Sequence, residues 1–251
     1  GPSGSEEQIR SIIRSEVEQY ADEIRVDAMG NLICRVAPKN PAPGSGPGAV
    51  PKRIMVDAHM DEIGIVVSYI DDKGFLRFSP VGGLSPHVLL GQKVVFADGT
   101  VGVFGTEKLD DIKDLKFDKM FIDIGARDRA EAQAKVRVGD AAAMVSSFAD
   151  MGERVSGKAM DDRIACLVLI EAMRRARPQV HEVYYVFAVQ EELGLRGART
   201  AAYGINPDVG IAVDVTLGGD TPEQAPFSVA RGGGAAIKTK DDSPKAHPAE
   251  T

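Results

Sequence analysis

The sequence contains no tryptophan, and aromatic residues make up only 6% of its 251 residues. Proteins that bind or cleave sugars commonly stack the sugar rings on aromatic side chains, so this scarcity disfavours a carbohydrate-active protein. Cysteine is almost as rare, because Cys34 and Cys166 are the two present and they form no C-x-x-C pair. A zinc ribbon or a disulfide framework is therefore not indicated, and we expect two buried, reduced thiols.

Long apolar runs and basic clusters are missing as well. No apolar stretch approaches the roughly 20 residues that a membrane-spanning helix needs, and the first residues, Gly1–Glu6, lack the character of a signal peptide. The net charge is -7 and the pI is about 5.2, which speaks against a nucleic-acid partner. These absences predict a folded, cytoplasmic protein that binds neither membranes nor nucleic acid, with enough apolar residues for one large or two smaller cores.

Three continuous apolar runs indicate strands of a sheet that is covered on both faces. They are Arg53–Ala58, Val183–Val189 and Val209–Val213. Apolar residues at helical spacing predict helices before and between the last two runs, most clearly over Ile164–Ala176. The predicted fold class is therefore α/β, with a mostly parallel mixed sheet flanked by helices.

The middle of the chain has a different pattern. From Ile65 to Val155, short alternating strands are separated by turn signals such as Asp72-Lys73-Gly74 and Val138-Gly139-Asp140. This pattern predicts a small β-rich domain inserted into the α/β domain. The expected organisation is a first part of the α/β domain over residues 1–64, the insert over 65–155, and the second part of the α/β domain over 156–251.

A histidine and several carboxylates follow the three apolar runs. His59 and Asp61 come after the first run, Glu191 and Glu192 after the second, and Asp214 after the third. In open α/β sheets, ligands bind beyond the carboxyl ends of the strands, so we expect these side chains at one edge. One imidazole with several carboxylates is the ligand set of zinc, cobalt or manganese, whereas calcium sites rarely use histidine. The sequence therefore predicts a transition-metal site.

The adjacent glutamates Glu191 and Glu192 are the strongest sign of this chemistry. Two like charges at a buried strand end raise each other's pKa and cost stability, and a metal ion relieves that cost. One glutamate can then bind the metal while the other serves as general base. Asp61 lies two residues beyond His59, a spacing that suits a partner orienting the imidazole.

A further acidic pair, Asp161-Asp162, stands at the start of the helix after the insert. Acidic residues there can simply complement the helix dipole. That simpler explanation fits Asp162, whereas the other carboxylates favour Asp161 as a member of the site.

Four motifs, taken together, resemble the signatures of the tetrahedral aminopeptidases, which are the glutamyl and deblocking aminopeptidases, some of them labelled endoglucanases. The likeness covers essentially the whole chain. The motifs are Asp57-Ala58-His59-Met60-Asp61-Glu62-Ile63-Gly64, Gly157-Lys158-Ala159-Met160-Asp161-Asp162-Arg163, Gln190-Glu191-Glu192-Leu193-Gly194 with Gly197-Ala198, and Asp214-Val215-Thr216.

The resemblance implies a zinc-aminopeptidase-like α/β catalytic domain interrupted by a β-barrel-like dimerisation domain, and dimers that assemble into a dodecamer. It implies removal of N-terminal residues from short peptides with a free N-terminus, by a metal-activated water. It also implies two divalent metal ions, zinc or cobalt, in a complete subunit. The implied roles are one ion on His59 and Asp214, a second on Glu192, Asp161 bridging both, Glu191 as general base, and Asp61 orienting His59.

One departure concerns the family's last metal ligand, a histidine in a C-terminal segment. His247 does not stand in that motif, so we expect the segment to be missing. The second metal site would then be incomplete, and this chain would hold one ion. A truncated subunit that assembles without catalysis therefore stays open as an alternative. A glycoside hydrolase that works through two carboxylates is a second alternative, which does not depend on the missing segment.

Overall fold

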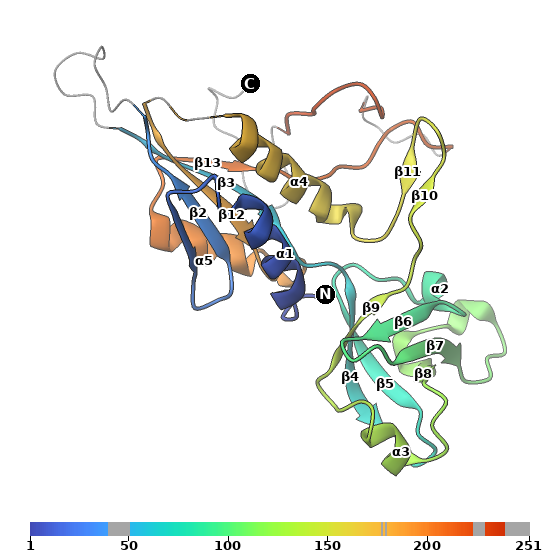
Figure 1. Ribbon diagram of the computed structural model, residues 1–251. Coiled ribbons are helices and arrows are strands. Elements are labelled where there is room, and N and C mark those ends of the chain that lie inside the picture. Colours follow the sequence, from blue (N-terminus) through green and yellow to red (C-terminus); the bar gives the residue numbers. More distant parts are fainter. Residues whose placement is uncertain (40–50, 177, 179, 223–228, 239–251) are drawn as a thin grey trace. The chain divides into compact units, whose positions relative to one another are not determined.

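The structure is a computed structural model that describes residues 1–39, 51–176, 178, 180–222 and 229–238 (Figure 1). The chain divides into two compact units, Gly1–Asp214 and Val215–Thr251. All helices and strands found in the described residues belong to the first unit.

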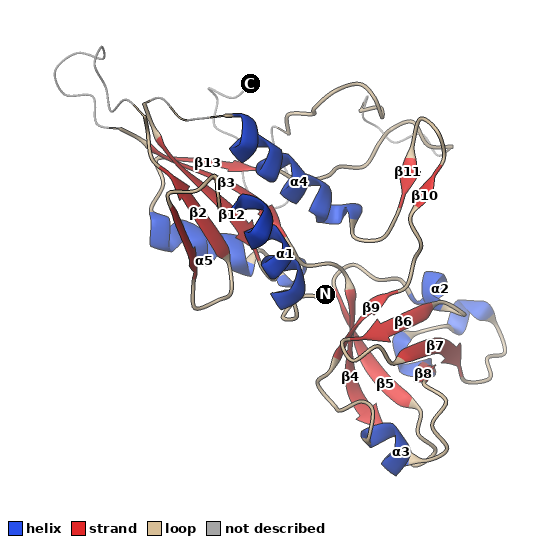
Figure 2. Ribbon diagram, in the orientation of Figure 1, coloured by secondary structure: helices blue, strands red, loops and turns tan. Residues whose placement is uncertain are grey.

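A five-stranded sheet with helices on both faces forms the α/β part (Figure 2). The strand order is β1-β2-β12-β3-β13. Strand β3 pairs in parallel with β12 and β13, whereas β2 is antiparallel to both β1 and β12, so β2 alone runs against the other strands. The mixed, mostly parallel sheet of the predicted fold class is thus confirmed. The elements of this part are α1 (Glu7–Val17), β1 (Glu23–Val26), β2 (Leu32–Val36), β3 (Arg53–His59), α4 (Met160–Arg175), β12 (Glu182–Ala188), the 3-10 helix η3 (Glu191–Leu193), α5 (Arg196–Ile205) and β13 (Val209–Ala212).

The strands of this sheet are apolar along their length because their side chains pack into two hydrophobic cores, one on each face of the sheet. Successive side chains of a strand point to opposite faces. Leu32 and Cys34 of β2 join the core beneath α1 and α4, while Ile33 between them joins the core beneath α5. Phe187 and Val186 of β12 divide in the same way. Both faces of the sheet are therefore buried, as the apolar runs predict.

The insert is a closed six-stranded antiparallel barrel, with strands in the order β4-β5-β8-β7-β6-β9. Closure of the barrel removes exposed sheet edges. The β-barrel-like insert that the predicted fold class contains is thus confirmed. The limits of the insert at residues 65 and 155 stay a prediction. Its elements are β4 (Gly64–Ile70), β5 (Leu76–Val81), α2 (Pro86–Leu89), β6 (Lys93–Phe96), β7 (Val101–Thr106), η1 (Ile112–Asp114), η2 (Phe117–Lys119), β8 (Met120–Asp123), α3 (Arg129–Gln133) and β9 (Ala141–Met144), followed by the hairpin of β10 (Ala149–Asp150) and β11 (Val155–Ser156).

Two further expectations concern the cysteines and the membrane. Cys34 and Cys166 are buried and free, as predicted. Among the helices of the described residues, none combines the length and the apolar character that crossing a membrane requires.

Phe104 in the core of the barrel allows this packing to be tested. It is 2% exposed and packs edge to face against Phe78, with ring centroids 5.1 Å apart. Replacing Phe104 with Ala should lower the free energy of unfolding by about 3–5 kcal/mol, because it removes a large buried ring and leaves a cavity. The neighbouring substitution Val103→Ala is the control, since Val103 is 40% exposed and should change stability by less than about 0.5 kcal/mol. Urea unfolding would measure both, and equal effects would contradict this description of the core.

Candidate metal centre

The ends of three parallel strands bring the predicted site residues together. His59 is the last residue of β3, Glu191 and Glu192 open η3 just after β12, and Asp214 follows β13 by two residues. Asp161 comes from the first turn of α4. The strands β12, β3 and β13 are neighbours in the sheet, so these residues share one edge.

Two groups of donor atoms result, and within each group the atoms lie within 4.8 Å of one another. The first consists of His59, Asp161 and Asp214, and the second of His59, Glu191 and Glu192. The first group matches the ligand set expected for one ion. The second differs from the expected pairing of Glu192 with Asp161, because here Glu192 groups with His59 and Glu191.

His59 is the shared member and is 4% exposed. Its Nε2 lies 3.0 Å from Asp161 Oδ1 and 3.8 Å from Glu191 Oε2. Its Nδ1 lies 3.0 Å from the carbonyl oxygen of Asp61 and 3.4 Å from that residue's carboxylate. Burial alone would lower the pKa of His59, but the hydrogen bonds with Asp161 and Asp61 outweigh it and raise the pKa to about 11. The surrounding carboxylates therefore favour positive charge at this point, which a divalent ion also supplies.

Asp61 is fully buried and connects the end of β3 to η3. Its carboxylate accepts hydrogen bonds from the backbone N–H groups of Glu191 and Glu192, with N···O distances of 3.0 and 3.2 Å. Burial would raise the pKa of Asp61, yet hydrogen bonds from His59, Ser3 and the Glu191 amide lower it. Asp61 thus keeps its charge and positions both His59 and the glutamates.

Glu191 and Glu192 both have raised pKa values, as expected for adjacent carboxylates at a strand end. Burial, followed by the charge of Asp161, raises the pKa of Glu192 to about 7, and burial also raises the pKa of Glu191. A glycine allows Glu192 its place: Gly82, at the end of β5, has φ +77°, and a Cβ there would lie 2.6 Å from Glu192 Oε2. Any larger residue at position 82 would displace this carboxylate.

Asp162 is a site residue that sequence reasoning did not identify. Its side chain is fully buried, and Oδ2 accepts the backbone N–H of His59 at 3.1 Å. The other oxygen, Oδ1, is buried without a hydrogen-bond partner in the part of the chain that the structure describes. Burial, followed by the charge of Asp214, raises the pKa of Asp162 to about 7. A buried carboxylate oxygen left without a donor beside this cluster fits a site that is completed by a cation.

Asn31 fixes the backbone that leads into the glutamates. Its Oδ1 accepts the N–H of Val189 at 3.0 Å, and its Nδ2 donates to Asp27 Oδ2 at 2.8 Å and to the carbonyl oxygen of Gly197 at 3.0 Å. Gly197 permits this close packing, because a Cβ there would lie 2.2 Å from the carbonyl oxygen of Val189. The sequence alone gives no sign of this role of Asn31, because its contact with Val189 joins residues 158 positions apart.

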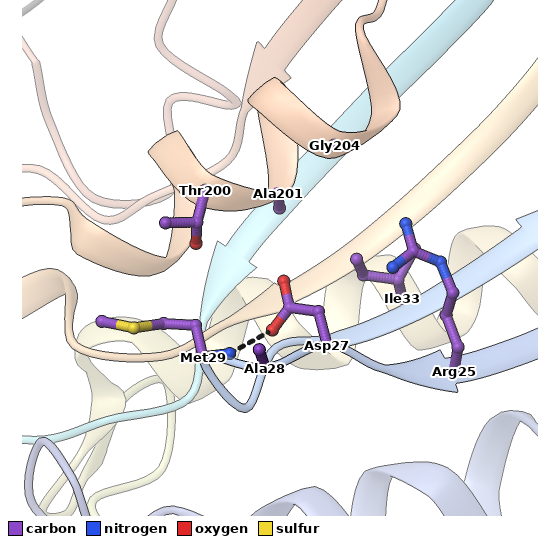
Figure 3. A pocket seen from close by; sticks show the side chains of 8 residues that line it. All are labelled: Arg25, Asp27, Ala28, Met29, Ile33, Thr200, Ala201 and Gly204. Carbon is purple, nitrogen blue, oxygen red and sulfur yellow. Dashed lines mark hydrogen bonds between the residues drawn. The ribbon is translucent and has the colours of Figure 1, made fainter.

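A hollow of about 360 Å³ lies beside the β1–β2 turn and α5 (Figure 3). The predicted site residues do not line it. Figure 3 shows Asp27 accepting the N–H of Met29, and Asp27 and Thr200 also bond Asn31, so the polar groups of the hollow support the backbone next to the site. Its lining residues are Arg25, Asp27, Ala28, Met29, Ile33, Thr200, Ala201 and Gly204.

Glu62 ties the end of β3 to the segment that carries Asp161. It is 3% exposed and accepts hydrogen bonds from Lys158 Nζ at 2.5 Å and Arg163 Nη2 at 3.0 Å. These two cations flank Asp161 in the sequence. Because a buried carboxylate needs such partners, Glu62 fixes the position of this segment relative to His59.

Comparisons with known proteins point to one family of peptidases. A family model described as M42 glutamyl aminopeptidase matches residues 44–249. A protein of Acetivibrio thermocellus assigned by name as an aminopeptidase is 52% identical over 249 residues, which cover 99% of this chain and 72% of that protein. The lysyl aminopeptidase of Pyrococcus furiosus is 37% identical over 221 residues, 83% of this chain and 61% of the relative. The chain therefore spans between about three fifths and three quarters of the length of these relatives.

Solved structures give the same picture. An aminopeptidase from the archaeon Desulfurococcus kamchatkensis is 36% identical with a TM-score of 0.79, and the match covers 90% of this chain and 62% of that one. The TET1 peptidase of Pyrococcus horikoshii, which can assemble into a tetrahedron or a large octahedral shell, is 35% identical with a TM-score of 0.74, covering 88% and 68% of the two chains. An endoglucanase of Thermotoga maritima is 34% identical with a TM-score of 0.74, covering 88% and 65%.

The ion pairs of Glu62 generate a stability prediction. Replacing Glu62 with Gln leaves Lys158 and Arg163 without their buried counter-charge, and should lower the free energy of unfolding by about 3 kcal/mol at pH 7. The exposed glutamate Glu7, whose closest approach to Arg10 is 4.0 Å, is the control, and Glu7→Gln should cost less than about 0.5 kcal/mol.

The loss of stability in Glu62→Gln, compared with Glu7→Gln, should also depend on pH. Burial would raise the pKa of Glu62, but the hydrogen bond from Lys158 and the charge of Arg163 lower it below the ordinary value of 4.5. The stabilisation is therefore fully present above about pH 4.5 and is lost as the pH falls through the lowered pKa. Urea unfolding between pH 7 and pH 3 should show the Glu62→Gln penalty shrinking at low pH, and a constant penalty would contradict the ion-pair explanation.

Proposed function

This chain belongs to the M42 glutamyl aminopeptidase family, and we propose that it carries the metal centre of an aminopeptidase that removes N-terminal residues from short peptides. The observation that supports this proposal is the convergence of His59, at the end of β3, with carboxylates from two other strand ends and from α4, in two donor groups that share the histidine. A chain that only served as a scaffold would have no need for this concentration of like charge around a buried histidine.

His59, Asp161 and Asp214 would hold one divalent ion in this chain, and Glu192 would contribute to a second ion in a complete subunit. The mixture of one imidazole with carboxylates suits zinc or cobalt. Such an ion would lower the pKa of a water molecule and polarise the peptide carbonyl group. The orphaned oxygen of Asp162 lies next to this cluster and supports the presence of a cation.

Glu191 is the proposed general base. Its carboxylate approaches His59 to 3.8 Å, its backbone is held by Asp61, and burial raises its pKa toward the range that suits a general base. Glu191 would take a proton from the attacking water and deliver it to the amine that leaves when the peptide bond breaks. Asp61 would hold both Glu191 and His59 in place during this transfer.

The proposed substrate follows from charge. The two donor groups hold four carboxylates and one imidazole, and this negative charge favours the protonated N-terminus of a peptide over its C-terminal carboxylate. We also propose assembly into a homo-oligomer up to a dodecamer, supported by the similarity to the TET1 peptidase, one structure of which is a dodecamer. The cytoplasmic location stays a prediction.

Glu191→Gln should lower turnover by about 100-fold or more, because it removes the base but leaves the donor group of His59, Asp161 and Asp214 intact. The measurement is kcat on short peptides with a free N-terminus, with metal content determined on the same samples. Metal content should stay near that of the unsubstituted protein. Near-normal turnover would show that Glu191 is not the base.

His59→Ala should abolish metal binding, because His59 belongs to both donor groups. His87→Ala is the matched control, since His87 lies exposed at the start of α2 and should leave binding unchanged. Titration with zinc or cobalt would measure the affinity and the number of ions. Treatment with a chelator should abolish peptide cleavage, whereas chelator-resistant cleavage of cellulose together with no peptide cleavage would favour the glycoside hydrolase.

A further inference from the structure

The residues before α1 lie against the metal centre and contribute a side chain to it. Ser3 is 7% exposed, and its hydroxyl donates a hydrogen bond of 2.5 Å to Asp61 Oδ2. The two residues are 58 positions apart in the sequence. A serine hydroxyl buried against a charged carboxylate makes a strong, charge-assisted hydrogen bond.

The distribution of donors around Asp61 shows what Ser3 controls. Oδ1 accepts the N–H of Glu191 and faces His59 Nδ1, while Oδ2 accepts the N–H of Glu192 and the hydroxyl of Ser3. Oδ2 thus has two hydrogen-bond donors, whereas Oδ1 has one, together with a contact of 3.4 Å with His59 Nδ1. Without the hydroxyl, Oδ2 would keep only the N–H of Glu192 as a donor, so the carboxylate would be held less firmly against rotation away from Glu191 and Glu192.

A second contact from the same segment supports this role. Glu6 is 3% exposed, and its Oε1 accepts the N–H groups of Gly4 at 2.8 Å and Gln190 at 3.2 Å. Gln190 has φ +54°, a left-handed conformation that is uncommon for this residue type and must be held by its surroundings. The segment therefore contacts both the residue that orients the site and the backbone that enters η3.

We infer that Ser3 is a positioning residue of the metal centre, acting through Asp61 on His59 and on the backbone of Glu191 and Glu192; its consequence for peptide cleavage rests on the proposed function. Ser3 touches neither the metal donors nor the reacting atoms. Its hydroxyl fixes the rotation of the Asp61 carboxylate, and that carboxylate fixes the distance between the strand ends that supply the donors. Zinc affinity and the order of η3 should both depend on this single hydroxyl.

The test compares three substitutions at Ser3 in the full chain. Ser3→Ala should weaken zinc binding by about tenfold, within the effect typical of outer partners of a metal site, and should speed hydrogen exchange of the Glu191 and Glu192 amides. Ser3→Thr, which keeps the hydroxyl, should restore both. Ser3→Cys replaces the hydroxyl with a weak donor of similar shape and should fall between the two, so it still decides the question if Ser3→Ala does not fold.

The control must loosen the segment without touching Asp61. Pro2 packs against Gly64, where an added Cβ would lie 2.4 Å from Pro2 Cγ. Pro2→Ala should lower stability while leaving zinc affinity and the exchange of the two amides unchanged. If Pro2→Ala changes them as much as Ser3→Ala does, Ser3 is only part of the packing. If Ser3→Ala changes neither zinc affinity nor amide exchange, the proposal is wrong.

These readouts separate the two proposals. Absence of peptidase activity in the unsubstituted chain would count against the proposed function and would leave the zinc and exchange measurements to decide the role of Ser3. If the unsubstituted chain is active, Ser3→Ala should lower kcat more than it raises KM, since the hydroxyl positions the base and the metal donors rather than the substrate. A rise in KM alone would contradict a role in positioning.

Discussion

The charged carboxylate of Asp61 is buried completely, and much of the site depends on satisfying it. A buried carboxylate stays ionised only where hydrogen bonds replace the lost water. The donors come from the end of β3, from the backbone of η3 and from Ser3, so the three segments must meet at this point. The chemistry of the site and the local packing of the chain therefore follow from the same requirement.

The sheet order makes this meeting possible. In the register of β12 with β3, Ala188 lies opposite His59, so the residues that follow β12 emerge beside the histidine. β13 flanks β3 on the other side and delivers Asp214. The ion pairs of Glu62 with Lys158 and Arg163 then bring the start of α4, and with it Asp161, to the same edge.

The features that were predictable from sequence are those that produce a pattern among residues close together in the chain. Apolar runs indicated β3, β12 and β13, and turn signals indicated the β-rich insert, because burial on one or both faces imposes a short-range pattern. The order of the six barrel strands was not predictable, since it depends on pairings between distant segments. Asp162, Ser3 and Glu6 were missed for a related reason: their roles rest on hydrogen bonds to residues 103, 58 and 184 positions away, which leave no periodic signal.

The electrostatics of the site link metal binding to folding. The pKa values of Glu192 and Asp162 are raised to about 7, and that of His59 to about 11, so burial and like charge make the carboxylates resist ionisation while His59 gains a proton. The raised pKa values of the two carboxylates mean that their negative charge costs stability in the folded chain, whereas the raised pKa of His59 means that a positive charge beside them is favourable. A cation that binds the folded chain and not the unfolded one offsets that cost by mass action. The same carboxylates that destabilise the strand ends in isolation thus become a source of stability once a metal is bound, which couples the folding of this edge to its function.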